Sequence, residues 1–89
     1  MNPLQRILEQ GLFGKKSGAV TPSDSTDLPG GPVKAIVLVT DGNVSFLPPG
    51  NANNEPVSFT GMLAGFVPPF HVRRVLATGT TATVRTVDD

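Results

Sequence analysis

The sequence predicts an all-β protein: a small antiparallel β-sandwich or barrel of the jelly-roll kind, preceded by a short helical or extended arm. From residue 17 onward, glycine and proline interrupt the chain every few residues, with 10 Gly and 9 Pro in 89 residues, as they do between strands. The segments between them are short and rich in valine, threonine and phenylalanine, which favour strands. A chain of this length holds one domain at most. We therefore divide it into an arm, residues 1–16, and a β body, residues 17–89.

The arm is expected to carry a short amphipathic helix. Asn2 suits the N-cap and Pro3 the first helical position, and Gly11 ends the helix. About two turns cannot persist alone, because isolated helices need roughly 12–15 residues, and residues 14–18 form a flexible tether. The helix either packs on its own body or docks on another chain, and the tether favours docking or disorder. The arm residues predicted to bind a partner are Leu4, Ile7, Leu8, Leu12 and Phe13.

The first half of the body is expected to hold three strands. An edge-like strand at residues 17–21 ends at Pro22. Residues 33–40 give the strongest strand signal, and their apolar residues run without alternation, so both faces should be covered, one of them in principle by a neighbouring subunit. The sequence Asp41-Gly42-Asn43 indicates a hairpin turn, after which residues 44–47 return as the partner strand.

Three more strands are expected in the second half. Residues 57–60 alternate, which turns their valine and phenylalanine inward. Residues 72–77 and 82–87 form the last two strands, and a tight turn around Gly79 joins them. The expected body is thus a set of short strands with glycine-rich and proline-rich connections.

Two irregular connections stand out in this half, at residues 47–56 and 61–70. The second is rich in glycine and proline but also carries large apolar side chains. Such side chains either cap the end of the barrel or meet a partner. We count Phe66 and Phe70 among the candidate partner-binding residues.

Arg73 and Arg74 are adjacent in an expected strand. Successive strand residues point to opposite faces, so the two arginines cannot clamp one ligand from a single sheet face. The plain interpretation is that both lie on a half-exposed strand. The alternative is that they pair with carboxylates such as Asp24 or Asp27 of another copy, which the planar guanidinium group favours.

The composition excludes several classes of function. Seven basic residues balance seven acidic ones, so we expect neither nucleic acid nor a membrane as partner, and a soluble protein made in a cytoplasm. The chain has no cysteine and a single histidine, His71, which speaks against disulfides, a zinc site and a catalytic triad. We expect no metal, no cofactor and no enzymatic activity. A small domain without these supports usually gains stability by associating with other chains.

Two segments carry a resemblance to a known family. The stretches AVTPSDSTDLP, residues 19–29, and VRRVLATGTTAT, residues 72–83, resemble the opening and closing stretches of the small spike base proteins of tailed bacteriophages and gene transfer agents. The intervening VKAIVLVTDGNVSFLP, VSFTGML and VPPF match the strand-turn-strand, short strand and proline-containing loop of that family. The resemblance spans roughly residues 19–84.

The resemblance implies a virion structural protein that oligomerises on the capsid exterior and decorates the head or anchors a spike or fibre. The expected partners are further copies of the chain, as a trimer or pentamer, the major capsid protein, and a spike or fibre protein. Two alternatives stay open: a cement protein between capsomers, and a carbohydrate-binding β module for host adhesion, which the lack of tryptophan and tyrosine disfavours. The candidate partner-binding residues of the body are Phe66, Phe70, Arg73 and Arg74.

Overall fold

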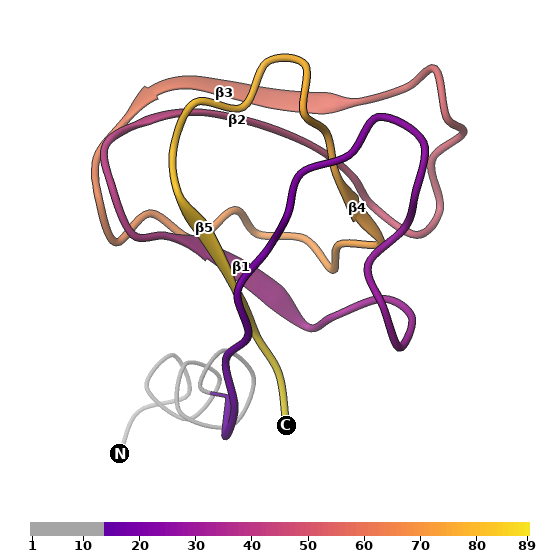
Figure 1. Cartoon of the computed structure of the whole chain (residues 1–89), viewed down its shortest axis with the longest axis horizontal. Coiled ribbons are helices and arrows are strands. Elements are labelled where there is room, and N and C mark those ends of the chain that lie inside the picture. Colours follow the sequence, from indigo (N-terminus) through magenta and orange to yellow (C-terminus); the bar gives the residue numbers. More distant parts are fainter. Residues whose placement is uncertain (1–13) are drawn as a thin grey trace.

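The computed structural model describes residues 14–89, and the candidate arm residues Leu4, Ile7, Leu8, Leu12 and Phe13 lie outside this range. The described chain is all-β, which confirms the predicted fold class (Figure 1). Its strands are β1 (Ala35–Leu38), β2 (Gly42–Leu47), β3 (Val57–Met62), β4 (Arg74–Val75) and β5 (Val84–Val87).

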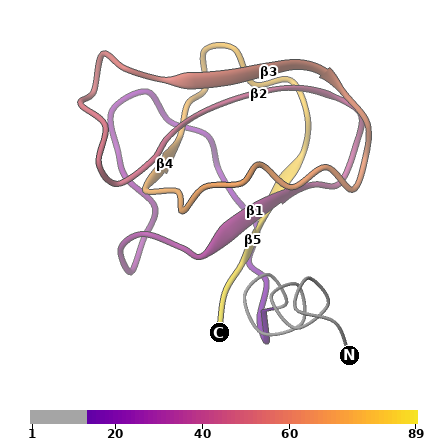
Figure 2. The ribbon, with the colours of Figure 1, turned by 180° about the vertical axis from the view of Figure 1, so that it is seen from behind.

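The strands form two antiparallel sheets. β1 pairs with β5, from Ala35 opposite Val87 to Leu38 opposite Val84. The second sheet has the order β3-β2-β4. In both side views, β1 and β5 cross the lower part of the body while β2 and β3 run across its upper part (Figures 1 and 2). The first strand of the body therefore pairs with the last.

The segment before β1 extends the first sheet along β5 without forming a full strand. Lys16 bridges to Asp88 and Ala19 to Arg85, and the Thr86 N–H donates to the Gly18 carbonyl at 2.8 Å. The strand predicted at residues 17–21 is thus present only as isolated bridges. Glycine within the segment weakens strand formation.

The predicted hairpin at residues 41–43 is wrong. β1 and β2 do not pair; the chain passes there from one sheet to the other. The polar side chains that suggested a turn bind the end of β3 and the segment after it instead: Asn43 Oδ1 accepts from Gly61 N at 2.8 Å, and Asp41 Oδ1 accepts from Ala64 N at 2.7 Å. Residue types that favour a hairpin turn are therefore also compatible with a turn that carries the chain from one sheet to the other.

The passage depends on Gly42, which has a φ of +148°. A Cβ at this position would lie 2.8 Å from Thr81 Oγ1 and 3.0 Å from the backbone nitrogen of Ala82. The register of β2 against β3 also shifts between Gly42 and Val44, as at a β-bulge, which bends a strand. Glycine and the bulge together redirect the chain.

The core contains residues of both sheets and is centred on Phe46, which is fully buried. Its ring stacks on Phe59 at a centroid distance of 6.2 Å, and Phe70 packs at a tilt 5.8 Å away. Phe66 meets Phe59 edge-on at 5.1 Å, a favourable aromatic geometry. The buried apolar cluster consists of Val33, Ile36, Leu38, Val44, Phe46, Val72, Val75, Ala82 and Val84.

The last two predicted strands are shorter than expected. β4 covers only Arg74–Val75 of residues 72–77, and β5 covers Val84–Val87 of residues 82–87. They pair with different neighbours, β2 and β1, so the turn at Gly79 links the two sheets. Gly79, with a φ of +90°, lets this turn close over Ser45, since a Cβ there would lie 3.2 Å from the Ser45 Cβ.

Nowhere in residues 14–89 does a helix have the length and apolar character needed to cross a bilayer.

Candidate partner-binding surfaces

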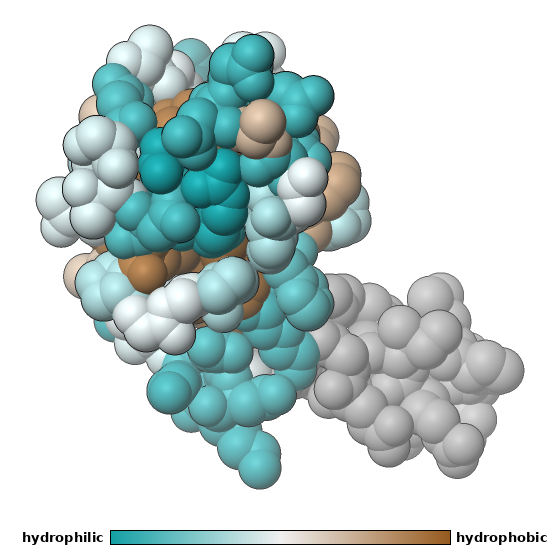
Figure 3. Space-filling model, turned by 90° about the vertical axis from the view of Figure 1, so that its right-hand side faces the viewer, coloured by the Kyte–Doolittle hydropathy of each residue, from teal (hydrophilic) through white to brown (hydrophobic). Residues whose placement is uncertain are grey.

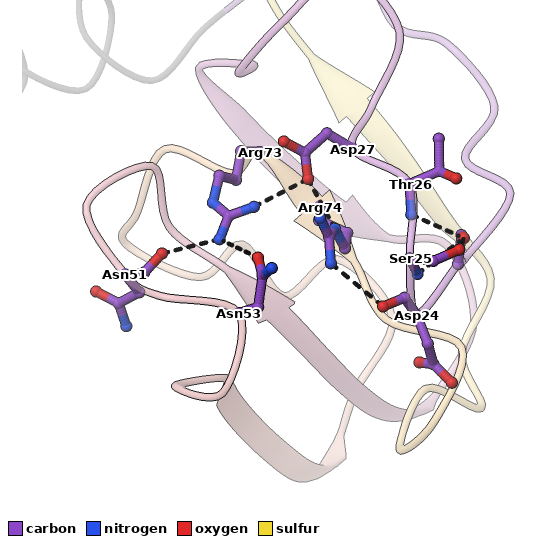
Figure 4. A network of polar contacts seen from close by, with 9 residues as sticks. Asp24, Ser25, Thr26, Asp27, Asn51, Asn53, Arg73 and Arg74 are labelled. Carbon is purple, nitrogen blue, oxygen red and sulfur yellow. Dashed lines mark hydrogen bonds and ion pairs between the residues drawn. The ribbon is translucent and has the colours of Figure 1, made fainter.

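Arg73 and Arg74 converge on one carboxylate of the same chain (Figure 4). Arg73 Nη1 lies 2.9 Å from Asp27 Oδ1, and Arg74 Nε lies 2.7 Å from the same oxygen. The two side chains leave opposite sides of the strand, but Asp27 stands beside its edge rather than over a face, so both reach it. The ion pairs that we considered between copies are therefore made within one chain.

This arginine cluster, which we define as Arg73, Arg74, Asp27, Asn51 and Asn53, fastens two loops to β4. Arg73 Nη2 donates to the Asn51 carbonyl and to Asn53 Oδ1, each at 2.9 Å. The backbone of residue 28 adds a bond, because Leu28 N donates to the Arg73 carbonyl at 2.8 Å. The loop at residues 47–56 and the segment at residues 23–28 are thereby held at one edge of the body.

The charges of the cluster have unequal access to water. The side chain of Arg74 is 10% exposed and that of Asp27 is 46% exposed. The hydrogen bond from the Arg74 guanidinium holds the pKa of the Asp27 carboxyl below its ordinary value of 3.8, and the positive charges of both arginines act in the same direction. Asp27 therefore stays ionised under all but strongly acidic conditions.

Asp24 makes a second link in the same region. Its Oδ1 accepts from Thr78 N at 2.9 Å and its Oδ2 from Thr78 Oγ1 at 2.7 Å. These bonds, the backbone one first, lower the pKa of the Asp24 carboxyl. Arg74 Nη1 also donates to the Asp24 carbonyl at 3.2 Å. The segment at residues 23–28 is thus tied both to β4 and to the turn before Gly79.

Large apolar side chains remain exposed at the sheet crossing. Leu63 is 72% exposed and Val39 is 49% exposed. Two backbone bonds hold their segments together: Gly65 N donates to the Leu38 carbonyl at 2.7 Å and Leu38 N to the Phe66 carbonyl at 3.0 Å. These bonds join the segment that carries Val39 to the segment that carries Leu63. Both side chains are exposed on the joined segments.

The two phenylalanines of the connection at residues 61–70 fill different places. Phe66 is half-buried against the core, whereas Phe70 contacts Phe46 and keeps 40% of its surface exposed. Phe66 thus follows the capping alternative, and Phe70 caps the core while part of its ring stays exposed.

A groove runs beside the segment at residues 16–19. Its volume is about 350 Å³, and the loop at residues 28–31 forms its other wall. A recess of about 280 Å³ continues it towards Val75 and shares Ala19, Leu28 and Pro29 with it. Figure 3 shows one side of the body as largely hydrophilic, with hydrophobic residues recessed between polar ones.

The chemistry of these surfaces is ion pairing, hydrogen bonding and apolar contact. Among residues 14–89, no group of three or more His, Cys, Asp or Glu side chains is placed to hold a metal ion. Every buried side-chain nitrogen or oxygen in this part of the chain has a hydrogen-bond partner. The hydrogen bonds of the polar clusters hold the loop at residues 47–56 and the segment at residues 23–28.

Sequence reasoning missed the partners that complete these clusters. Asn51, Asn53 and Thr78 are each distant in sequence from the groups they bind. The available signal was the charge balance: two adjacent arginines in a small neutral chain need acidic or carbonyl acceptors, and Asp24 and Asp27 were candidates, although as residues of another copy. The apolar side chains expected in the connection at residues 61–70 include the exposed Leu63, whereas the exposure of Val39 had no sequence signal, because both faces of residues 33–40 were expected to be covered.

Comparison with known proteins finds a similar chain in a solved structure. No family model and no curated protein matches the sequence. A solved structure, the capsid of a native GTA (gene transfer agent) particle computed with C5 symmetry, contains a chain that is 35% identical, with a TM-score of 0.70. The match covers 84% of this chain and 83% of that one. This degree of identity over most of both chains shows that the protein belongs to the head-related proteins of phages and gene transfer agents, as a structural, virion-associated component.

Proposed function

We propose that the protein is a head decoration or spike base protein that oligomerises on the capsid exterior and anchors a spike or fibre. The observation that carries this proposal is the 35% identity to a chain of a GTA capsid. The match covers 84% of the chain, more than the arm alone could account for. This coverage supports a role for the β body in assembly.

The exposed apolar residues favour association of several copies, as a trimer or pentamer. Leu63 is 72% exposed on a segment that two backbone bonds already hold in place, so little further ordering is needed when it is covered. Burying a leucine side chain stabilises a complex by roughly 1.5–3 kcal/mol. Phe70 offers a second apolar contact, with its ring already held by Phe46.

The arm is proposed as the anchor to the major capsid protein or to the next component. Leu4, Ile7, Leu8, Leu12 and Phe13 supply its apolar contacts. The arginine cluster has a supporting role in this proposal: by fixing the loops at residues 23–28 and 47–56, it presents them as a rigid surface. Arg73 and Arg74 then act on a partner through the loops that they hold.

Copy number in purified particles tests the proposal. Particles are produced with the full chain, with Ile7→Asp, or with Gln10→Asp as the matched control at a polar position of the expected helix, and copies are counted by quantitative mass spectrometry. We expect the full chain and Gln10→Asp to be incorporated equally and Ile7→Asp to be largely lost. Particles that lack the full chain would contradict the proposed function, and normal incorporation of Ile7→Asp would contradict the role of the arm.

A further inference from the structure

β3 forms one edge of its sheet and pairs only with β2. The hydrogen bonds of β2 show which groups of β3 face outward. Ser45 N donates to Thr80 Oγ1 at 2.9 Å, and the Ser45 carbonyl accepts from Leu76 N at 2.9 Å, so the backbone of Ser45 faces away from β3. Ser45 lies opposite Ser58, and in such a pair the backbone groups of the facing residue also point away. The N–H and C=O of Ser58 therefore lie on the open edge.

Thr60 presents its backbone to the same edge. Gly61 N donates to Asn43 Oδ1, on the β2 side, and successive strand residues alternate. Within residues 14–89 no backbone hydrogen bond joins Ser58 or Thr60 to any segment beyond this edge. Proteins that stay single usually protect such an edge with lysine, proline or a covering loop. β3, with the sequence VSFTGM, contains neither charge nor proline.

The neighbouring edges of both sheets are covered. The segment at residues 23–28 lies along β4, where Ser23 N donates to the Val75 carbonyl at 2.9 Å. Beside β1, Val33 and Val72 exchange two backbone bonds, at 2.9 and 3.1 Å. Neither β4 nor β1 thus shares the open edge of β3.

A second edge lies in the segment at residues 16–20, where the Ser17 carbonyl already accepts from Arg85 Nη2 at 3.2 Å and the open backbone groups are those of Ala19. Lys16, Gly18 and Val20 direct their backbone groups towards β5, so those of Ala19 face the other way. The groove of about 350 Å³ is lined by Ala19 and also by Thr86 and Asp88. The described chain begins in the lower part of the body and β3 lies in the upper part (Figures 1 and 2). Two different open edges on one chain allow copies to associate head to tail, which closes into a ring when the rotation permits.

We propose that the open edge of β3 pairs with the edge at residues 16–20 of a second copy of this chain. The flanking charges support this partner: Asp41 and Glu55 stand near the two ends of β3, and Lys15 and Lys16 precede Ala19. Opposite charges on the two edges favour this pairing over β3 with β3, which would bring like charges together. The inference rests on the proposed function, since it names the contact by which copies associate.

Cysteine cross-linking tests the pairing, because the natural chain has no cysteine. Full-length Thr60→Cys is mixed with Ser17→Cys, Ala19→Cys or Thr21→Cys and oxidised, with Ala52→Cys in the loop at residues 47–56 replacing the second partner as control. We expect one of the three mixtures to give a covalent dimer of the two different variants, and the Ala52→Cys mixture to give none. A dimer formed by Thr60→Cys alone, or no dimer in any mixture, overturns the proposal.

A second pair of variants addresses the backbone directly. Thr60→Pro removes an outward N–H that the fold does not use, which edge strands tolerate, and Thr60→Ala removes the side chain but keeps the N–H. We expect Thr60→Pro to raise the concentration for half-assembly by about tenfold or more, with Thr60→Ala close to the natural chain. Thr60→Lys gives the same readout should the proline variant not fold.

The outcomes separate this inference from the proposed function. Unchanged assembly of Thr60→Pro and Thr60→Lys overturns the edge pairing, and so does a natural chain that stays single at high concentration. Absence of the natural chain from particles contradicts the proposed function instead. Incorporation of the natural chain together with failed cross-linking would leave the virion role standing and remove only this contact.

Discussion

Arg74 donates through Nε to Oδ1 of Asp27 at 2.7 Å, and this contact joins β4 to a loop 47 residues earlier in the chain. The guanidinium is nearly buried, whereas the carboxylate reaches the surface. Removing the carboxylate charge therefore leaves a buried cation without its ionic partner, which costs more than the loss of an exposed pair.

Asp27→Asn is accordingly expected to lower the melting temperature. Asp89→Asn is the matched control, because Asp89 is 73% exposed and pairs with Lys34 at 3.2 Å, and exposed pairs contribute little. Thermal unfolding followed by circular dichroism measures both. If the Asp27→Asn protein melted at the same temperature as the control, water would be shown to replace this carboxylate without loss of stability.

The same carboxylate predicts a dependence on pH. The pKa values of Asp27 and Asp24 are lower in the folded protein than their ordinary value of 3.8, so the unfolded chain binds more protons as the pH falls below that value. Their stabilising contribution is complete above pH 3.8 and is lost as the pH falls through the folded values. We expect the difference in melting temperature between the natural chain and Asp27→Asn to be constant near neutral pH and to shrink in strong acid. A difference that grew in acid would contradict this sign.

Gly42→Ala is expected to destabilise the fold by about 1–3 kcal/mol, the usual cost of a strained backbone conformation. The φ of +148° and the close approach to Ala82 leave no room for a Cβ. Gly50→Ala is the control, since Gly50 has no positive φ and an open surrounding. Urea unfolding of the two variants should separate them clearly, and equal stability would contradict the role of Gly42 in the sheet crossing.

Phe46→Ala is expected to destabilise the body by about 3–5 kcal/mol, as large-to-small changes in a core do. Phe46 is fully buried and contacts two other rings. Phe70→Ala should cost clearly less, because part of that ring is already in water. The free energy of unfolding in urea gives both values, and the reverse order would place the centre of the core elsewhere.

Leu63→Ser should leave the fold intact and weaken association between copies. The side chain is the most exposed large apolar group in the described chain, so it contributes little to the single molecule. Ala64→Ser, at the next exposed position, is the control. Native mass spectrometry across a concentration series measures the change, and equal masses for both variants would show that Leu63 faces solvent in the assembly.

Local patterns in the sequence predicted the all-β class and the positions of most strands. Residues 33–40 and 57–60 carry strand signals that depend only on their own side chains, and β1 and β3 lie there. The pairing of strands was not predictable in the same way. Asp41-Gly42-Asn43 looks like a hairpin turn, yet the partners of Asp41 and Asn43 lie about twenty residues away.

In the candidate site, too, the residues were predictable from the sequence and their partners were not. The importance of Arg73 and Arg74 could be predicted from their position beside a strand, but their acceptors could not. Alternation along a strand separates two neighbouring side chains only with respect to the faces of the sheet. It does not forbid both from bending around the edge towards Asp27, and only the path of residues 23–28 places a carboxylate there.

The pairing of β1 with β5 also bears on how the protein is made. Val84–Val87 is synthesised after the other strands of the body, and Ala35–Leu38 has no other partner strand among residues 14–89. Contacts between distant parts of a chain form late and slowly. The body is therefore expected to fold only after Val84–Val87 has left the ribosome, and a product that stops before this strand would leave β1 unpaired.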